Sequence, residues 1–212
     1  MRTHTKTAVL CALAAAAAFW CASNAAAQNP PQDQISFEGL ENLAFEKPTW
    51  INGGAGQGHA GLLTDGETAS DPYLGGPTRV GVDFEEVVKI NGIHIWHYWA
   101  DGRTYTGNII ALSEALDFGD LADGDKDRLD DIAGIVTIFN TDADDETYAE
   151  SAAGYKLVFE AVDAQYLHAW LGGSDANQWS HWVEIQAYFN PDLLSVDPEG
   201  KAAAVWGDLK TR

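Results

Sequence analysis

Cysteine is nearly absent from this chain, and the shortage limits how the fold can be stabilised. The only two cysteines, Cys11 and Cys21, lie near the N-terminus, in a segment that we expect to be removed. The remaining chain would then have no disulfide and no thiol chemistry. Burial of apolar side chains, or a bound metal, must therefore stabilise the folded domain.

Long apolar runs are also missing beyond the N-terminus. Arg2 and Lys6 precede the short apolar run Ala8–Trp20, and small residues up to Ala27 offer cleavage sites, a pattern typical of a secretory signal peptide. The run is shorter than the roughly 20 apolar residues that span a bilayer. We therefore expect a secreted or periplasmic protein with no membrane insertion.

Basic residues are few, at 12 against 32 acidic residues, which gives a net charge of −20. Loss of Arg2 and Lys6 with the signal peptide leaves ten basic residues and a net charge of −22. Nucleic-acid binding needs basic patches that contact backbone phosphates, so nucleic acid is excluded as a partner. Such acidity suits solubility, a salty environment or divalent cations.

Sequence motifs of common enzymes are missing as well. The chain has no Gly-x-Ser-x-Gly nucleophile elbow and no His-Glu-x-x-His zinc helix. His94 and His97 are three residues apart on a predicted strand, so they point to opposite faces and cannot share a metal. A glycosidase carboxylate pair is not excluded by counting, although no pair stands out. We therefore expect a protein without catalytic activity. A polysaccharide-active hydrolase is the least favoured of the functions that we consider.

Alternation of apolar and polar residues predicts a series of short strands, and helical periodicity is scarce. The predicted strands cover the first half of 90–105 together with residues 79–84, 109–113, 135–139, 156–159, 166–171 and 182–189. The last one places Val183, Ile185 and Ala187 on one face and Trp182 and Glu184 on the other. Short strands with Gly-rich connections predict one all-β domain, an antiparallel β-sandwich or jelly roll.

The stretch Ile90–Tyr105 contains most of the candidate ligand-binding residues. Its strand pattern breaks at Ala100–Arg103, where Asp and Gly favour a turn, and binding residues are commonly held on such loops. Aromatic faces stack on sugar rings, while charged and amide groups bind sugar hydroxyls. The candidates are Tyr98, Trp99, Asp101 and Arg103 in this loop, His97 before it, and His59 and Trp179 in neighbouring loops.

Each of these residues also has a purely structural interpretation. Aromatic residues at the end of a strand are commonly part of the core or of an edge. His97 shares its parity with Ile93 and Ile95, so it is equally well explained as a core histidine or as a residue behind the ligand site.

A set of short motifs follows in a fixed order along the chain. They are Asn42–Ala44 with Lys47–Pro48, Leu62–Gly66, Val82–Phe84, Asp101–Tyr105 with Ser113, Tyr148–Glu150 with Gly154, Gln165–Leu167 and His181–Ile185. In order and spacing they resemble the discoidin-type, galactose-binding-like domains, a superfamily that includes coagulation-factor C domains, fucose lectins and bacterial carbohydrate-binding modules. The resemblance implies a jelly roll of about eight strands with a shallow ligand site in the loops at one end. Of the His and two arginines of fucose lectins, only Arg103 is matched, which puts fucose specificity in doubt.

The same resemblance implies a structural Ca²⁺. Its ligands would be Asp65, Thr68, the carbonyl of Leu62, and Glu184 from the closing strand, in keeping with the oxygen ligands that Ca²⁺ takes. From the residues alone, a simple Asp-Gly turn and a solvated Glu184 explain the pattern better, and only the resemblance favours the calcium site. The acidic segment Asp117–Asp131 lacks EF-hand spacing, so we interpret it as a solvated loop.

The sequence therefore predicts four segments: a signal peptide at 1–27, a linker or first strand at 28–41, a discoidin-like domain at 42–190, and a tail at 191–212 with moderate helix propensity. The predicted function is that of a non-catalytic carbohydrate-binding module of an exported protein, stabilised by calcium. The alternative is a structural or adhesive subunit that binds a protein partner through the same loops.

Overall fold

The computed structural model describes residues 31–51, 54–55, 58–76, 79–115, 132–141 and 150–194. The predicted signal peptide, the acidic segment 117–131 and the tail beyond residue 194 lie outside the described residues. The described strands are β1 (Thr49–Ile51), β2 (Gly54–Ala55), β3 (Leu74–Gly75), β4 (Arg79–His97), β5 (Tyr105–Thr106), β6 (Ile109–Ser113), β7 (Ile135–Asn140), β8 (Tyr155–Trp170), β9 (Gly173–Ser174) and β10 (His181–Tyr188). Three short 3₁₀-helices accompany them: η1 (Gln32–Gln34), η2 (Gly58–Thr64) and η4 (Pro191–Leu194).

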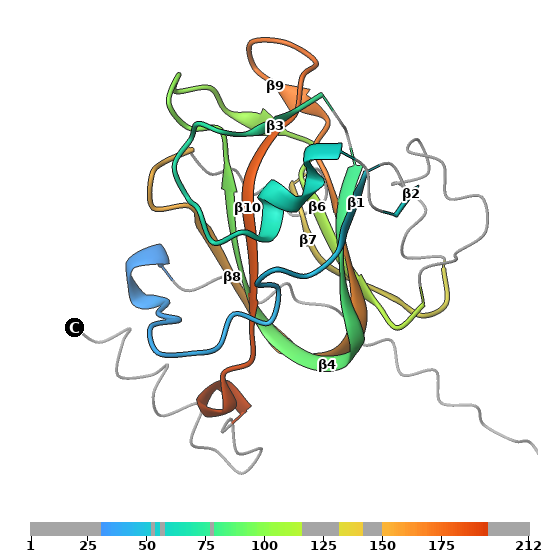
Figure 1. Cartoon of the computed structure of the whole chain (residues 1–212). Coiled ribbons are helices and arrows are strands. Elements are labelled where there is room, and N and C mark those ends of the chain that lie inside the picture. Colours follow the sequence, from blue (N-terminus) through green and yellow to red (C-terminus); the bar gives the residue numbers. More distant parts are fainter. Residues whose placement is uncertain are drawn as a thin grey trace, which may run out of the picture.

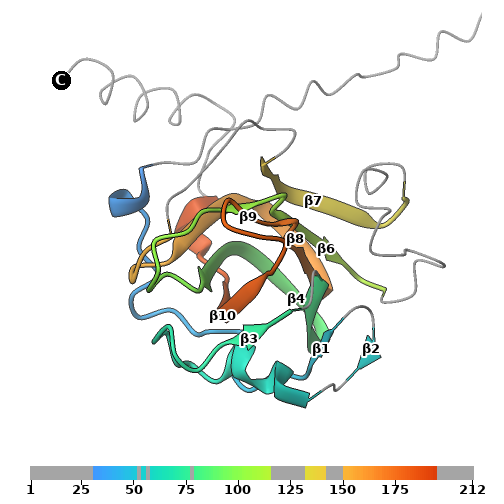
Figure 2. The ribbon, with the colours of Figure 1, turned by 90° about the horizontal axis from the view of Figure 1, so that it is seen from above.

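The strands form the predicted antiparallel β-sandwich (Figure 1). The main sheet runs in the order β2-β1-β4-β8-β6-β7, β10 also pairs with β4, and β3 pairs with β10. The small β5–β9 sheet and β3 both lie at one end of the sandwich, and Figure 2 looks along the sandwich from that end. This end carries the predicted ligand loop, because β4 finishes there at His97.

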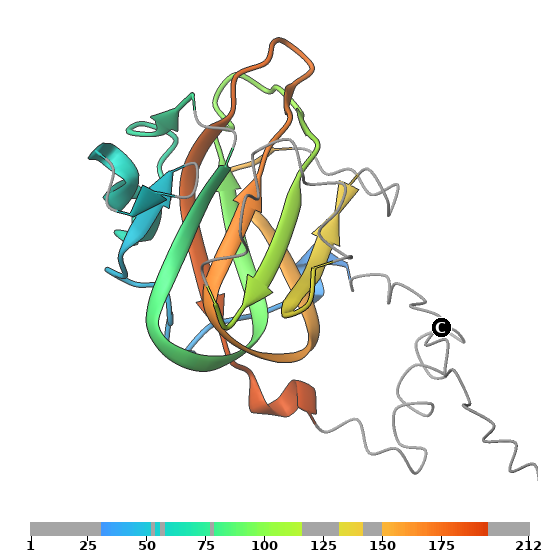
Figure 3. The ribbon, with the colours of Figure 1, turned by 90° about the vertical axis from the view of Figure 1, so that its right-hand side faces the viewer.

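Two long bent strands join the layers of the sandwich. The first arm of β4, Arg79–Asp83, pairs with β1 and with the end of β8, whereas the second arm, Val88–His97, pairs with β10 and the start of β8. The register shifts between Asp83 and Val88, and Glu85 between them has φ of 68°. Figure 3 shows this bend at the opposite end from β3 and β9. Pairs of strands that the sequence predicts separately, 79–84 with 90–97 and 156–159 with 166–171, are therefore single continuous strands.

The main core lies between the two arms of these strands. Its fully buried members include Val82 and Leu167 from one layer and Ile93, Leu157 and Ile185 from the other. Apolar burial at roughly 25 cal/mol per Å² is the main stabilising term for a domain without disulfides.

The alternation predicted for β10 is wrong at its first residues. The register against β4 shifts between Trp182 and Glu184, which is the mark of a β-bulge. Trp182 consequently joins the main core together with Ile185 and Ala187, although simple alternation places it on the other face. The bulge cannot be predicted from alternation, because it inserts one residue into the period of two.

The segment before residue 42 packs against the sandwich. The ring of Phe37 stacks on Tyr188 with centroids 4.5 Å apart, and Ile35 belongs to the same small cluster. The side-chain amide of Gln32 donates to the carbonyl of Lys156 at 2.9 Å and accepts from its N–H at 2.7 Å. This stretch is therefore attached to the domain and acts as part of it. Among the described residues, none of the helices has the length and apolar character needed to cross a membrane.

One close approach in the sheet gives a testable prediction for stability. A Cβ added at Gly81 would lie 2.0 Å from the Trp50 ring, which is fully buried. We expect Gly81→Ala to lower the free energy of unfolding by about 1–3 kcal/mol, because overpacking must displace the indole. Denaturant unfolding measures the change. Gly61→Ala is the control, since a Cβ there meets nothing within 4 Å, and an equal loss in both variants would contradict the prediction.

Candidate functional site

The loop after β4 forms the predicted turn. The N–H of Gly102 donates to the carbonyl of Trp99 at 3.3 Å, and Gly102 has φ of 72°, which suits glycine. Asp101 and Arg103 face each other across this turn: the Arg103 Nε donates to Asp101 Oδ2 at 2.7 Å, and Nη2 forms an ion pair with the same oxygen. Burial works against ionisation of Asp101, but the hydrogen bonds from Arg103 hold its pKa below the ordinary value.

A histidine that the sequence did not single out for ligand binding completes this arrangement. The Arg103 Nη1 lies 3.4 Å from Nδ1 of His181, the first residue of β10. A guanidinium can only donate, so Nδ1 accepts and the imidazole carries its proton on Nε2. Burial, and then the charge of Arg103, lower the pKa of His181, which favours the neutral ring.

Two tyrosines enclose His181. The Tyr73 ring lies 4.7 Å from the imidazole and 4.6 Å from the Tyr98 ring, and the Arg103 guanidinium is 6.0 Å from the Tyr98 centroid. We call these five residues, Tyr73, Tyr98, Asp101, Arg103 and His181, the loop cluster. The loop cluster combines the aromatic faces of two tyrosines, the Arg103–Asp101 pair as donor and acceptor, and the neutral imidazole of His181. These residues come from segments that are far apart in the sequence.

Trp179 lies beside the loop cluster and is the most exposed large apolar side chain of the described residues, at 53%. Its ring lies against Gly76, where an added Cβ would come within 3.3 Å, and Gly76 donates its N–H to the carbonyl of Ser180. The loop that carries Trp179 is attached to the Asp101–Arg103 loop, because Asp175 and Thr104 exchange two hydrogen bonds of 2.9 and 3.1 Å. These two hydrogen bonds join the two loops.

His97 and Trp99 have their recorded polar partners outside the loop cluster, and the side chain of a third predicted ligand residue, His59, is not described. His97 is buried, with its Nδ1 3.1 Å from the Glu150 carboxylate and its ring 4.8 Å from Trp182, so it lies in the core beneath the loop. Trp99 directs its Nε1 toward the carbonyl of Thr68 at 3.5 Å. His59 belongs to η2, but its side chain lies outside the described residues.

The sequence held only a weak signal for the two residues it missed. His181 opens the segment that carries the family resemblance, but its position opposite Gly75 follows from the β3–β10 pairing. Tyr73 precedes the two-residue strand β3, which is too short for a periodicity argument. Both positions depend on pairing between segments about a hundred residues apart.

The predicted metal ligands surround a buried carboxylate. Glu184 is fully buried, and its Oε1 accepts from the N–H of Gly66 at 3.1 Å and from the amide of Gln186 at 3.3 Å. Its Oε2 has no hydrogen-bond partner in the described part of the chain. Burial, with the nearby charges of Asp65 and Glu67, raises the pKa of Glu184 to about 8.

This arrangement fits a cation held largely by oxygen atoms. The turn at Asp65 and Gly66 brings a second carboxylate and backbone carbonyls next to Glu184, and a cation there would bind the free Oε2. In the described ranges, no group of three or more His, Cys, Asp or Glu side chains could hold a metal. Backbone and hydroxyl oxygens, such as those of Leu62 and Thr68, would have to supply the other ligands.

A buried serine–histidine pair on β6 and β8 has a structural role. Ser113 Oγ lies 2.9 Å from His168 Nε2 and donates to the carbonyl of Ala115 at 2.8 Å, while His168 Nδ1 faces Arg79 at 3.3 Å. The imidazole thus donates from Nε2 to the hydroxyl and accepts at Nδ1, so it cannot take the serine proton. Burial, and then the charge of Arg79, lower the pKa of His168 to about 3.

Comparison with known proteins identifies similar solved structures. One is CpGH89 from Clostridium perfringens in complex with its substrate GlcNAc-α-1,4-galactose, with a TM-score of 0.51 and 14% identity over 69% of this chain and 14% of that one. Another is the CBM32 of AlyQ in complex with 4,5-unsaturated mannuronic acid, with a TM-score of 0.42 and 16% identity over 59% of this chain and 82% of that one. A pectin-binding carbohydrate-binding module matches with a TM-score of 0.41 and 20% identity, over 58% of this chain and 74% of that one.

These similarities concern the fold, because all of the identities are low. The chain spans only 14% of the length of the glycoside hydrolase, and several of the similar structures are carbohydrate-binding modules. No family model matches the sequence, and no curated protein matches it. The comparisons agree with the all-β sandwich that the strand pairing defines.

The raised pKa of Glu184 predicts a pH dependence of stability in chelator-containing buffer. The folded pKa of about 8 lies above the ordinary glutamate value of 4.5, so between these pH values the folded state binds more protons than the unfolded state. The contribution of Glu184 to the melting temperature should be largest below about pH 4.5. As the pH rises from there to about 8, this contribution should be lost and the melting temperature should fall. Glu184→Gln should flatten this part of the curve, as thermal unfolding across the range would measure.

The exposed carboxylate of Glu160 on β8 provides the matched control, as Glu160→Gln removes a carboxylate from the surface. If Glu184→Gln and Glu160→Gln left equal slopes between the two pH values, the burial argument would be refuted.

Proposed function

We propose that this chain is a carbohydrate-binding domain that holds a sugar at the loop cluster and beside Trp179. The observation that carries the proposal is the contact of the Asp101–Arg103 pair with His181 among the rings of Tyr73 and Tyr98. Sugar recognition needs apolar faces for the C–H surfaces of the ring together with oriented donors and acceptors for its hydroxyls. Both kinds of group lie here at one end of the sandwich.

The polar groups of the loop cluster match hydroxyls in kind. Arg103 supplies donors, the Asp101 carboxylate supplies acceptors, and the neutral imidazole of His181 can donate from Nε2. Because Asp101 balances the charge of Arg103, the polar part of the site suits hydroxyl groups without requiring a charged ligand. Tyr73 and Trp179 are both exposed and provide the apolar faces.

A structural Ca²⁺ at Glu184 is the second part of the proposal. The ion would join the carboxylate of Glu184 to Asp65, Thr68 and the Leu62 carbonyl, and would stabilise the turn against β10. The unpartnered Oε2 of Glu184 supports it, because an ionised buried carboxylate needs a compensating charge. When bound, the ion supplies a local positive charge that keeps this carboxylate ionised.

We further propose that the domain acts without catalysis as a binding module of an exported protein. The N-terminal signal-peptide pattern supports export, and the all-β fold of similar binding modules agrees with this role. A protein partner would contact the same exposed rings, so the binding experiment below must include both kinds of ligand.

The binding proposal predicts a loss of affinity without loss of stability. Trp179→Ala should weaken binding to the best ligand of a glycan array at least tenfold, because an exposed ring contributes stacking area and little folding energy. Arg103→Lys should also weaken binding, because lysine keeps the charge but lacks the planar fork. Calorimetric titration measures affinity, and thermal unfolding measures stability.

Val136→Ala, which truncates another exposed apolar residue on β7, is the control and should bind as the parent does. The proposal fails if no glycan binds, or if affinity falls only in variants that also unfold. Binding to a protein ligand alone, with the same two losses, would support the adhesive alternative instead.

The calcium proposal predicts a concentration-dependent gain in melting temperature. A ligand that binds only the folded state stabilises it by mass action, by about 2.7 kcal/mol at a hundred times its dissociation constant. We expect calcium to raise the melting temperature of the parent chain and of Glu160→Gln, and chelator to reverse the rise. Glu184→Gln should show no response to either, and an identical response in all three chains would count against the site.

A further inference from the structure

His181 is a titratable ring of the loop cluster whose two edges have different contacts. Its Nδ1 accepts a hydrogen bond from Arg103 Nη1 at 3.4 Å, so the neutral imidazole carries its proton on Nε2. The Cδ2–Nε2 edge faces β3, because a Cβ added at Gly75 would lie 3.3 Å from Cδ2 and 3.5 Å from Nε2. Nδ1, the atom that contacts Arg103, is therefore the nitrogen that gains a proton when the ring becomes charged.

Aromatic rings from other segments pack around this imidazole. The Tyr73 centroid lies 4.7 Å from that of His181, the Tyr98 centroid 5.8 Å and the Tyr105 centroid 6.3 Å. The N–H of Tyr98 also donates to the carbonyl of His181 at 3.1 Å. A change at the His181 ring therefore acts on both segments that pack on the start of β10, the one before β3 and the one after β4.

The charged groups that face His181 in the described part of the chain are Arg103 and Asp101, and its other ring neighbours are tyrosines, which are neutral below about pH 8. Burial, and then the charge of Arg103, lower the pKa of His181, while Asp101 raises it by less. Hydrogen bonds from Arg103 outweigh the burial of Asp101 and hold the pKa of that carboxyl below its ordinary value. His181 is thus the member of the loop cluster whose charge can change in mildly acidic solution.

Protonation of His181 would place two donors and two positive charges against each other. The new N–H on Nδ1 would point at a guanidinium nitrogen that itself can only donate. Arg103 is also held from its other edge, because its Nε donates to Asp101 Oδ2 at 2.7 Å. The charged imidazole and the guanidinium can therefore separate only if one of these side chains leaves its present position.

We propose that His181 is a pH switch of the carbohydrate site: the neutral imidazole holds Arg103 in its binding orientation, and the imidazolium displaces it and weakens sugar binding. The inference rests on the carbohydrate site proposed at the loop cluster and adds the regulation of that site. Sugar whose hydroxyls meet Arg103 binds the neutral form more tightly, so by reciprocity bound sugar makes His181 harder to protonate.

The first test measures affinity at about pH 7.5 and about pH 5, a range in which ordinary carboxylates stay ionised and an imidazole can become protonated. The neutral glycan that binds most tightly on the array is titrated into the full chain. Chelator is present throughout, so that loss of a cation in acid cannot give the same result. We expect about tenfold weaker binding at pH 5, roughly the loss of one hydrogen bond to a charged group. Melting temperatures at both pH values confirm that the chain is folded.

Two histidine variants separate His181 from other titrating groups. In His181→Asn, the amide oxygen can replace Nδ1 as the acceptor for Arg103, but it does not become protonated in this range. Its affinity should be the same at both pH values, whatever that affinity is. His94→Gln is the matched control, because His94 Nε2 lies 2.7 Å from the carbonyl of Ala153 and a glutamine amide can keep that contact. This variant should retain the tenfold change of the parent.

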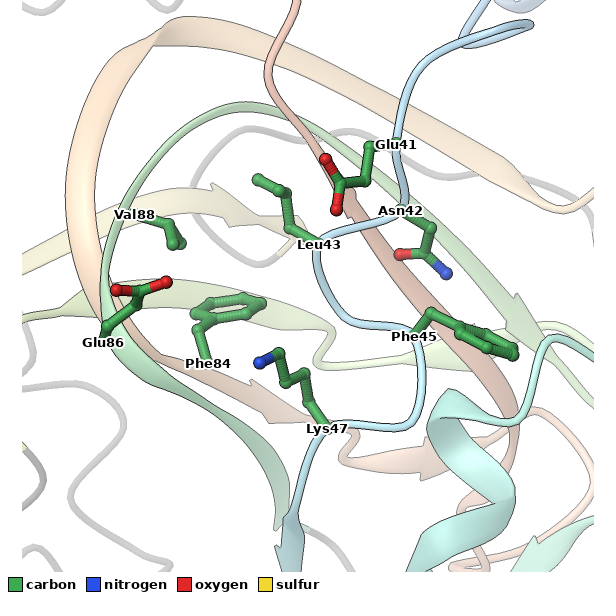
Figure 4. A pocket seen from close by; sticks show the side chains of 8 residues that line it. All are labelled: Glu41, Asn42, Leu43, Phe45, Lys47, Phe84, Glu86 and Val88. Carbon is green, nitrogen blue, oxygen red and sulfur yellow. The ribbon is translucent and has the colours of Figure 1, made fainter.

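A third variant controls for the charge of the whole surface. Glu86 is exposed and lines a pocket of about 470 Å³ beside the bend of β4, at the opposite end of the sandwich from the loop cluster (Figures 3 and 4). Glu86→Gln should keep the pH dependence of the parent. An equal reduction of the pH dependence in Glu86→Gln and His181→Asn would show a general effect of net charge and refute the switch.

The second test needs no sugar. NMR of the histidine ring nitrogens follows the protonation of His181, and the backbone amide signals of Asp101–Arg103 follow the loop. We expect both sets of signals to change with the same midpoint. Arg103→Gln should raise the His181 midpoint, because it removes the facing cation. Saturating glycan should lower the midpoint of the parent chain.

The two tests distinguish failure of the switch from failure of the carbohydrate site. Equal affinity at both pH values in a parent chain that binds glycan would overturn the switch alone, as would full pH dependence in His181→Asn. Absence of glycan binding at either pH would refute the carbohydrate site. The sugar-free test then decides on the switch, which is refuted if the loop signals do not follow His181 or if Arg103→Gln leaves the midpoint unchanged.

Discussion

The buried carboxylate of Glu184 is the group on which the loop geometry depends most directly. It lies on β10 beneath the Asp65–Gly66 turn and accepts the N–H of Gly66, so a central strand and a surface turn share one polar contact. Phe45 packs on the other side of this turn. A fully buried carboxylate is unfavourable when it is ionised without a partner, so the protonation or cation occupancy of this one group affects every segment that rests on the turn.

Hydrogen bonds of the backbone also position the loop cluster. The N–H of Tyr98 donates to the carbonyl of His181 at 3.1 Å, which extends the β4–β10 pairing by one step beyond the end of β4. Hydrogen bonds between Thr104 and Asp175 then join the loop that follows β4 to the loop that precedes β10. Side chains held by paired backbone lose little conformational freedom when they bind a ligand, and this preorganisation favours affinity in a shallow site.

How far the sequence could predict this structure depends on the range of the interactions. The pattern of apolar residues located β6, β7 and β10, because that pattern is local. It could not show that β4 continues through its bend at Glu85, or that β10 contains a bulge. The turn that pairs Asp101 with Arg103 was local and could be predicted, whereas His181 and Tyr73 reach the loop cluster through the long-range β3–β10 pairing. Tyr98 and Trp99 are adjacent aromatic residues that the sequence could not distinguish as ligand candidates. In the structure, Tyr98 contacts His181, whereas Trp99 directs its Nε1 toward the carbonyl of Thr68.

Net charge sets a limit on which ligands the loop cluster can select. With a net charge of −20, the chain repels anionic polymers at long range whatever groups line a local site. The loop cluster contains one balanced acid–base pair and so adds little to that field. Screening reduces the repulsion over about 10 Å at 0.1 M salt. Selection against anionic glycans should therefore weaken as ionic strength rises, while the proposed recognition of neutral hydroxyls by Arg103 and Asp101 would depend on short-range geometry and should change little.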